Sequence, residues 1–255
     1  MQDAASLLID SRRSATPLDR LPDDLRPTDA AAAFAIQKQV TETLGDAVAG
    51  WKCAVPAGEK LIAAPIFASG LVDLTAAPGA EIPVAGALAC VEPELAFILK
   101  EDLPARAQPY SRDEIRAAIG SVRLALEIIA SRFADPSACS QLELLADGMF
   151  NDGLVLGPVV EDAFAQDLDG FALVVESGTT LRHDGRHPSG DALAPLEWLA
   201  NNAALTGANL RAGQAIITGS YAGMLDFACG TPHRLAYGAL GEFEVRFARR
   251  DADAA

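Results

Sequence analysis

Two glutamates inside an otherwise apolar segment, residues 89–100, constrain this chain more than any other feature. The segment reads ACVEPELAFILK, which is typical of a β-strand. Side chains two residues apart on a strand point to the same face, so Glu92 and Glu94 share a face with Ala96 and Ile98. The opposite face is apolar and consists of Val91, Leu95, Phe97 and Leu99.

Two adjacent carboxylates on a buried face repel each other and lose their hydration. The pair is tolerated if one carboxylate is protonated or if a cation lies between them. A hard divalent ion such as Mg²⁺ prefers oxygen ligands and suits such a pair. The alternative is a sheet-edge strand on which Glu92 and Glu94 simply face water.

Length and composition narrow the class of protein. A chain of 255 residues can bury a sizeable core, as one large domain or as a small and a large one. The formal charge of −15 argues against binding nucleic acid through a broad basic surface. Because no secretory signal and no membrane-length apolar run are evident, we expect a cytoplasmic protein that does not enter membranes. The scattered cysteines, Cys53, Cys90, Cys139 and Cys229, indicate reduced thiols.

The helix signals are few. A short helix is expected over residues 3–13, and a second one begins after Thr28 or Asp29 and ends at Gly45. Ser111 and Glu114 form a capping box that opens a third helix, which runs to residue 119. A fourth helix is expected over residues 193–205.

Strand signals dominate the rest. Residues 50–54 form a short strand that contains Lys52, for which the alternative reading is an exposed lysine on an edge strand. Residues 55–69, with Glu59, look like a mobile loop with a helical turn. Residues 121–133 alternate strictly and place Glu127 on the minority face, where its alternative role is to pair with Arg123 or Arg132.

Further strands follow the same logic. They are expected at residues 71–74, 81–84 and 151–160, in a hairpin around residues 177–178, in a strand that runs into a small-residue loop at 215–224, and in a hairpin around residues 238–241. Many strands, few helices and no βαβ rhythm indicate an α+β fold with a mostly antiparallel or mixed β core.

The motifs, taken in order, resemble a known family. They are GWK (50–52), VEPELAFIL (91–99), ALEIIASRF (125–133), ADGMFNDGLVLG (146–157), PLEWLANN (195–202) and IITGSYAGM (216–224). In this order they resemble the 2-keto-4-pentenoate hydratase group of the fumarylacetoacetate hydrolase superfamily, which also contains 4-oxalocrotonate decarboxylases. The resemblance runs from about residue 30 to residue 247.

The resemblance implies a rolled, barrel-like mixed β-sheet, sometimes described as a β-clip, with peripheral helices. It also implies Mg²⁺ or Mn²⁺ held by Glu92, Glu94 and Glu127. We therefore expect an N-terminal helical segment (1–50) packed on a catalytic β-rich domain (51–250), followed by a disordered tail (251–255). Three carboxylates on minority faces of apolar strands agree with one hard cation.

Other site residues are also carried over from the resemblance. Lys52 matches an active-site lysine that could hold a substrate carboxylate or shuttle a proton, and Asp73 and Glu59 are further candidates for proton transfer. Asp147 and Ser220 match substrate-lining positions. The chain departs from the family where residues 53–57 and 148–150 replace small polar residues, which predicts a less polar pocket.

The histidines argue against one branch of the superfamily. Its C–C hydrolases use a His–Glu pair with the histidine in the first half of the chain, whereas His183, His187 and His233 all lie in the later half. A hydrolase is therefore not expected. His183 and His187 lie in a polar stretch that predicts surface positions.

The expected activity is that of a metal-dependent hydro-lyase that adds water to a short unsaturated 2-oxo acid through an enolate. The alternatives are decarboxylation of a 2-oxo diacid, which uses the same enolate, and a non-catalytic partner subunit. A homo-oligomer is expected, with a complex with a pathway decarboxylase or aldolase as a further possibility implied by the resemblance.

Overall fold

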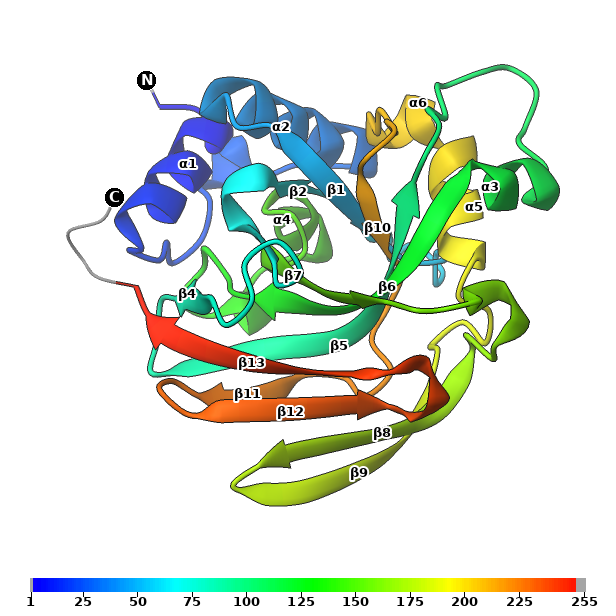
Figure 1. Cartoon of the computed structure of the whole chain (residues 1–255). Helices are drawn as coiled ribbons and strands as arrows, with labels where there is room; N and C mark the ends of the chain where they lie inside the picture. The colour runs from blue at the N-terminus through cyan, green and yellow to red at the C-terminus, as the bar shows by residue number, and fades with distance from the viewer. Residues whose placement is uncertain (1, 251–255) are drawn as a thin grey trace.

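The computed structural model describes residues 2–250, so the predicted tail 251–255 lies outside the described residues. Two β-sheets pack face to face, and the helices lie together on the far side of the first sheet (Figure 1). The α-helices are α1 (Ala4–Ser14), α2 (Ala30–Leu44), α3 (Arg112–Ala118), α4 (Gln141–Ala146), α5 (Ala194–Asn201) and α6 (Ala203–Thr206). Short 3₁₀ turns are η1 (Asp23–Leu25), η2 (Ala68–Gly70), η3 (Pro136–Ala138), η4 (Ala163–Ala165) and η5 (Gly238–Leu240).

The first sheet has eight strands and is mixed. Its order is β2-β1-β10-β5-β6-β7-β3, with β11 paired to β5 at the other end of that long strand. Its strands are β1 (Val48–Cys53), β2 (Ala63–Phe67), β3 (Leu71–Asp73), β5 (Leu88–Leu99), β6 (Ile119–Ile129), β7 (Asn151–Val159), β10 (Ala215–Ile217) and β11 (Leu225–Ala228). The sheet is rolled, and β2 at one edge also contacts β7 near the other edge.

The two faces of this rolled sheet have different roles. Val91, Leu95 and Phe97 on β5 belong to the main core, which continues into the second sheet and the helices. Ala96 on the same strand belongs to a second, smaller apolar cluster inside the roll, together with Ala125, Leu154, Leu156, Ile66, Ala215 and Ile217. The alternation predicted for β5 is therefore confirmed.

The second sheet has five strands, in the order β4-β13-β12-β8-β9. Its strands are β4 (Glu81–Val84), β8 (Gly170–Ser177), β9 (Thr179–Arg186), β12 (Pro232–Tyr237) and β13 (Glu242–Arg249). Both predicted hairpins are present in it. Tyr237 connects the two sheets, because its buried hydroxyl donates to the carbonyl of Ala125 on β6 at 2.8 Å.

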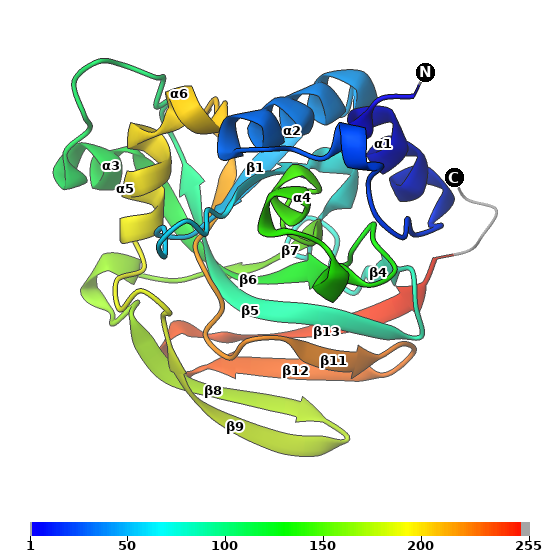
Figure 2. The same cartoon turned by 180° about the vertical axis from the view of Figure 1, so that it is seen from behind.

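Local signals fixed most helix ends. The Asp29 side chain caps α2, Gly45 ends it with a left-handed backbone (φ 66°), and the capping box of Ser111 and Glu114 opens α3. The helix predicted over residues 193–205 is interrupted at Asn202, where α5 stops and α6 begins. Figure 2 shows α4 between α2 and the rolled sheet.

The prediction of a mobile loop over residues 55–69 is wrong in its second half. Residues 63–67 form the buried strand β2, which pairs with β1 antiparallel. Pro65 is accepted there because β2 lies at the sheet edge, where a missing N–H costs no ladder bond. The proline and alanines of residues 63–67 suggested a loop, but in the structure these residues are buried in the rolled sheet.

Two simpler expectations can also be compared with the structure. All four cysteines are free thiols; Cys53 is buried and the other three are half-buried. Among the described residues, no helix is long and apolar enough to cross a membrane.

Candidate metal centre and active site

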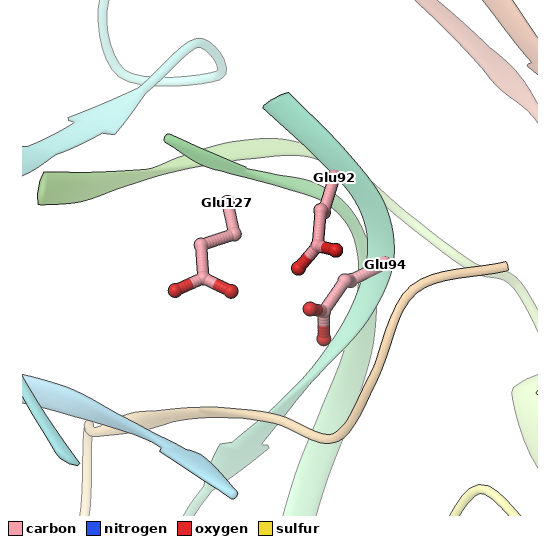
Figure 3. A group of neighbouring side chains, drawn as sticks. All are labelled: Glu92, Glu94 and Glu127. Carbon is pink, nitrogen blue, oxygen red and sulfur yellow. The ribbon is translucent and has the colours of Figure 1, made fainter. Parts of the chain in front are cut away.

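The three predicted glutamates meet inside the rolled sheet. In the antiparallel pair of β5 and β6, Glu92 lies directly opposite Glu127, and Glu94 is two residues further along β5 on the same face. One carboxylate oxygen from each lies within 4.8 Å of the others. Figure 3 shows the three side chains pointing into the same space. Because β5 lies between β10 and β6, the alternative of an edge strand facing water is wrong.

Lys52 completes the cluster from β1. Its Nζ lies 2.7 Å from Oε1 of Glu127, and it donates to the carbonyl of Met149 at 2.8 Å. The side chain is only 10% exposed, and β1 is flanked by β2 and β10. The alternative of a surface lysine on an edge strand is therefore wrong. The alternative pairing of Glu127 with Arg123 or Arg132 is also wrong, because Glu127 forms its ion pair with Lys52.

Glu127 also shows how the site fits a cation. Its Oε1 accepts hydrogen bonds from Lys52 and from the amide of Asn151, the latter at 2.8 Å. Its Oε2 is buried and has no hydrogen-bond partner among the described residues. A buried carboxylate oxygen without a partner is costly. The donor set of hard oxygens therefore fits a divalent cation, which would satisfy this atom.

The charges agree with this fit. The cluster holds three carboxyl groups and one ammonium, a formal excess of two negative charges. Burial, followed by repulsion from Glu127, raises the pKa of Glu92, although the charges of Lys52 and Lys60 partly offset the effect. Burial and the same repulsion raise the pKa of Glu94 well above its usual range.

A loop after β10 holds Glu94. The backbone N–H of Gly219 donates to Oε2 of Glu94 at 2.7 Å. Gly219 has φ 135°, and a Cβ there would lie 2.7 Å from Cγ of Pro188, so only glycine fits. The next residue, Ser220, places its Oγ 3.3 Å from the carbonyl of Pro93, which separates the two glutamates of β5.

A tight turn between α4 and β7 positions two of these contacts. Gly148, Met149 and Phe150 all have positive φ (85°, 52° and 70°), which is unusual for the two non-glycine residues. The turn directs the Met149 carbonyl to Lys52 and delivers Asn151 to Glu127. The Met149 side chain packs in the main core instead. At this position, contrary to the sequence prediction, the apolar side chain therefore does not make the pocket less polar.

Three predicted site residues lie outside the cluster. Asp73 forms a two-pronged ion pair with Arg123 (2.6 and 2.7 Å), which, with a hydrogen bond from Thr75, holds its pKa well below the usual range against the opposing effect of burial. Arg123 precedes Glu127 by four strand residues, a separation of roughly 13 Å. The Asp147 carboxylate is buried and accepts a hydrogen bond from Nε of Arg132 at 2.7 Å.

The remaining candidate, Glu59, is exposed on the loop between β1 and β2. The positive charge of Lys60, on the same loop, partly offsets the rise in the pKa of Glu92. Three polar groups of the site were not singled out from the sequence: the Asn151 amide, the Gly219 N–H and the Met149 carbonyl. Two are backbone groups, which carry no residue-type signal.

The surface prediction for the histidines is wrong at His187. This side chain is buried, and its Nε2 lies 3.1 Å from the Thr218 carbonyl, beside the loop that holds Glu94. His183 is half-buried. The polar residues around them suggested a surface loop, but the end of β9 packs on residues 218–221.

A rolled sheet that encloses three carboxylates and an ammonium defines a protein built around a buried, oxygen-lined centre. The sequence profile of the fumarylacetoacetate (FAA) hydrolase C-terminal family matches residues 34–248, and the chain belongs to this family. This result confirms the family and the rolled-sheet fold expected from the motifs.

Named relatives are more distant. The chain is 26% identical over 255 residues to a 2-keto-4-pentenoate hydratase of Burkholderia vietnamiensis (strain G4 / LMG 22486), with 95% of each chain covered. It is 28% identical over 256 residues to a 2-keto-4-pentenoate hydratase of Paraburkholderia xenovorans (strain LB400), covering 96% of this chain and 94% of that one.

A solved structure shows the same fold. The 4-oxalocrotonate decarboxylase from Pseudomonas putida G7, complexed with magnesium and adipate, superposes with a TM-score of 0.73 at 20% identity. The superposition covers 96% of this chain and 95% of that one.

Proposed function

We propose that the chain is a divalent-metal-dependent hydro-lyase that adds water to a short unsaturated 2-oxo acid, of the 2-hydroxypenta-2,4-dienoate type. The single observation that carries this proposal is the buried cluster of Glu92, Glu94 and Glu127 with Lys52 beside it. The names of the hydratases that the chain resembles over nearly its whole length support the choice of reaction.

Glu92, Glu94 and Glu127 would hold the ion, Mg²⁺ or Mn²⁺. The excess of two negative charges and the unpartnered Oε2 of Glu127 support a single divalent cation. When bound, such an ion supplies Lewis-acid neutralisation of the negative charge that develops on the 2-oxo acid as its enolate forms.

Lys52 would act on the substrate directly. An ammonium has three N–H donors, and Glu127 and Met149 engage two of them. The third can donate to a substrate carboxylate or deliver a proton during ketonisation. Ser220 and the Gly219 N–H lie on the Glu94 side of the cluster, where they would line the bound acid.

The other proton-transfer candidates receive different roles. Glu59 is exposed on the loop between β1 and β2 and remains a candidate for moving protons to and from water. Asp73 is held as an anion by Arg123, so we assign it to positioning β3 rather than to proton transfer. Asp147, through Arg132, would brace the turn that carries Met149.

The test is a reaction followed in two ways. Purified, metal-free chain receives Mg²⁺ and 2-hydroxypenta-2,4-dienoate, and diene absorbance is recorded; a parallel reaction with a 2-oxo diacid is assayed for CO₂. Magnesium-dependent loss of the diene without CO₂ release is expected. If the chain releases CO₂ from the diacid and does not consume the diene, it is a decarboxylase and not a hydratase. If neither reaction occurs, the result supports a non-catalytic subunit. Homo-oligomerisation and a pathway complex stay predictions.

A further inference from the structure

A large arginine-lined cavity lies away from the glutamate cluster. It has a volume of about 830 Å³, which is within the range of small-molecule sites. Its arginines come in two adjacent pairs, Arg12 and Arg13 from the last turn of α1 and Arg249 and Arg250 from the end of β13. Figures 1 and 2 both show α1 beside the end of β13.

The positive charge in the cavity is only partly compensated. Asp152 is shared by Arg12 (3.8 Å), Arg132 (3.3 Å) and Arg250 (3.6 Å). Burial and repulsion from Arg132 lower the pKa of Arg12 to about 10, against the attraction of Asp152 and Asp147. Within residues 2–250, neither Arg13 nor Arg249 forms an ion pair, and the cavity's other carboxylate, Asp46, accepts a hydrogen bond from the N–H of Ser69.

An interaction with the end of a helix accounts for only two of the four arginines in this cavity. Basic residues in the last turn of α1 interact favourably with its carbonyl end. Arg249 ends strand β13 and Arg250 directly follows it, so neither belongs to a helix and neither has such a role. In a chain with a formal charge of −15, the convergence of four arginines on one cavity calls for a negatively charged occupant.

We propose that this cavity binds a small, multiply charged anion, with carboxylate or phosphate groups held by Arg12, Arg13, Arg249 and Arg250. The planar guanidinium recognises both groups through paired hydrogen bonds. The site is independent of the proposed hydratase activity, because none of the three glutamates lines it. Asn151 lines the cavity and also donates to Glu127, so the two sites adjoin.

Binding is measured by calorimetry on the full chain after metal removal on a chelating resin. The probes are propane-1,2,3-tricarboxylate and inorganic phosphate, and the probe that binds identifies the chemical class. We expect one site per chain and at least a tenfold weaker affinity in Arg249→Gln/Arg250→Gln. The matched control, Arg182→Gln/Arg186→Gln on the exposed hairpin strand β9, should bind as the unmodified chain does.

Two further variants keep the proposal falsifiable. Arg13→Gln changes an exposed side chain and should also weaken binding. This variant tests the site even if Arg249→Gln/Arg250→Gln fails to fold. A chain shortened after Arg250 removes two negatively charged residues, Asp251 and Asp253. Binding of neither probe to the full or the shortened chain overturns the proposal. An equal loss of affinity in the control pair also overturns it, because it would reduce the effect to overall charge.

Discussion

Lys52 and Glu127 form a buried ion pair, 2.7 Å from Nζ to Oε1, across strands that are not neighbours in the rolled sheet. This contact uses Oε1 of Glu127, while Oε2 is buried without a hydrogen-bond partner among the described residues. The pair therefore distinguishes the three glutamates: Glu127 forms a direct ion pair with Lys52, whereas among the described residues neither Glu92 nor Glu94 forms an ion pair.

Replacing the glutamates should separate metal binding from stability. Glu94→Gln and Glu127→Gln should each weaken Mg²⁺ binding by more than about 100-fold, because each removes an anionic ligand. In the metal-free protein, Glu94→Gln should raise the free energy of unfolding by about 1 kcal/mol by removing repulsion. Glu127→Gln should lower it by about 3 kcal/mol, because the buried Lys52 ammonium loses the carboxylate that it contacts directly.

Calorimetry with Mg²⁺ and urea unfolding of the metal-free variants provide both measurements. Glu101→Gln, an exposed glutamate just beyond β5, is the control and should change neither quantity. Unchanged Mg²⁺ affinity in both cluster variants would contradict the metal site.

Lys52→Met should distinguish the two roles of the ammonium. If Lys52 holds the substrate carboxylate, KM should rise by roughly 10- to 150-fold, the equivalent of about 1.5–3 kcal/mol. If it transfers a proton, kcat should fall by about 10²–10⁴. Steady-state kinetics at saturating Mg²⁺ separates these outcomes, with the exposed Lys100→Met as the control. Unaltered kcat and KM would remove Lys52 from the active site.

Asn151→Ala should weaken metal binding without removing a ligand. The Asn151 amide fixes the orientation of the Glu127 carboxylate, and partners of this kind typically contribute 10- to 100-fold in metal affinity. Calorimetry with Mg²⁺ tests this, and Asn209→Ala on an exposed loop is the matched control. An affinity equal to that of the unmodified chain would show that Lys52 alone suffices to orient Glu127.

The sequence was sufficient where the signal is local. On a strand, side-chain parity places Glu92 and Glu94 on one face of β5 and Glu127 on the minority face of β6, and the register of the two strands brings these faces together. Helix caps at Asp29 and Ser111 act within four residues and were equally readable. The same parity argument separated the inner and outer faces of β5.

The remaining features depend on contacts distant in sequence. Lys52 is buried because β1 pairs with β10, more than 160 residues later, and no pattern around Lys52 contains that information. His187 is buried by the loop at residues 218–221 for the same reason. The turn at residues 148–150 could not be read either, because two of its left-handed residues are not glycine.

Glu143 provides a test of stability against pH. It is fully buried in the capping box of α4, where it accepts hydrogen bonds from Arg20 and from the N–H of Ser140. Burial raises its pKa, but the hydrogen bonds from Arg20 and Ser140 outweigh burial and bring the pKa to about 2, below the ordinary value of 4.5. The folded state therefore binds this proton less readily than the unfolded state does.

A lowered pKa makes the sign of the effect definite. The stabilisation is fully present above pH 4.5 and is lost as the pH falls from 4.5 through 2. Because Arg20 is 34% exposed, solvent screens part of the interaction. We therefore expect Glu143→Gln, which keeps the capping geometry, to lower the free energy of unfolding at pH 7 by about 2 kcal/mol.

Urea unfolding at pH 7 and pH 3 measures this difference. It should be smaller at pH 3 than at pH 7, because below pH 4.5 the unfolded state of the unmodified chain takes up the proton, and this favours unfolding. Glu42→Gln, whose side chain is 67% exposed on α2, should show less than about 0.5 kcal/mol at either pH. A difference for Glu143→Gln that is the same at both values would mean that the variant acts through packing and not through the charge of the Arg20 pair.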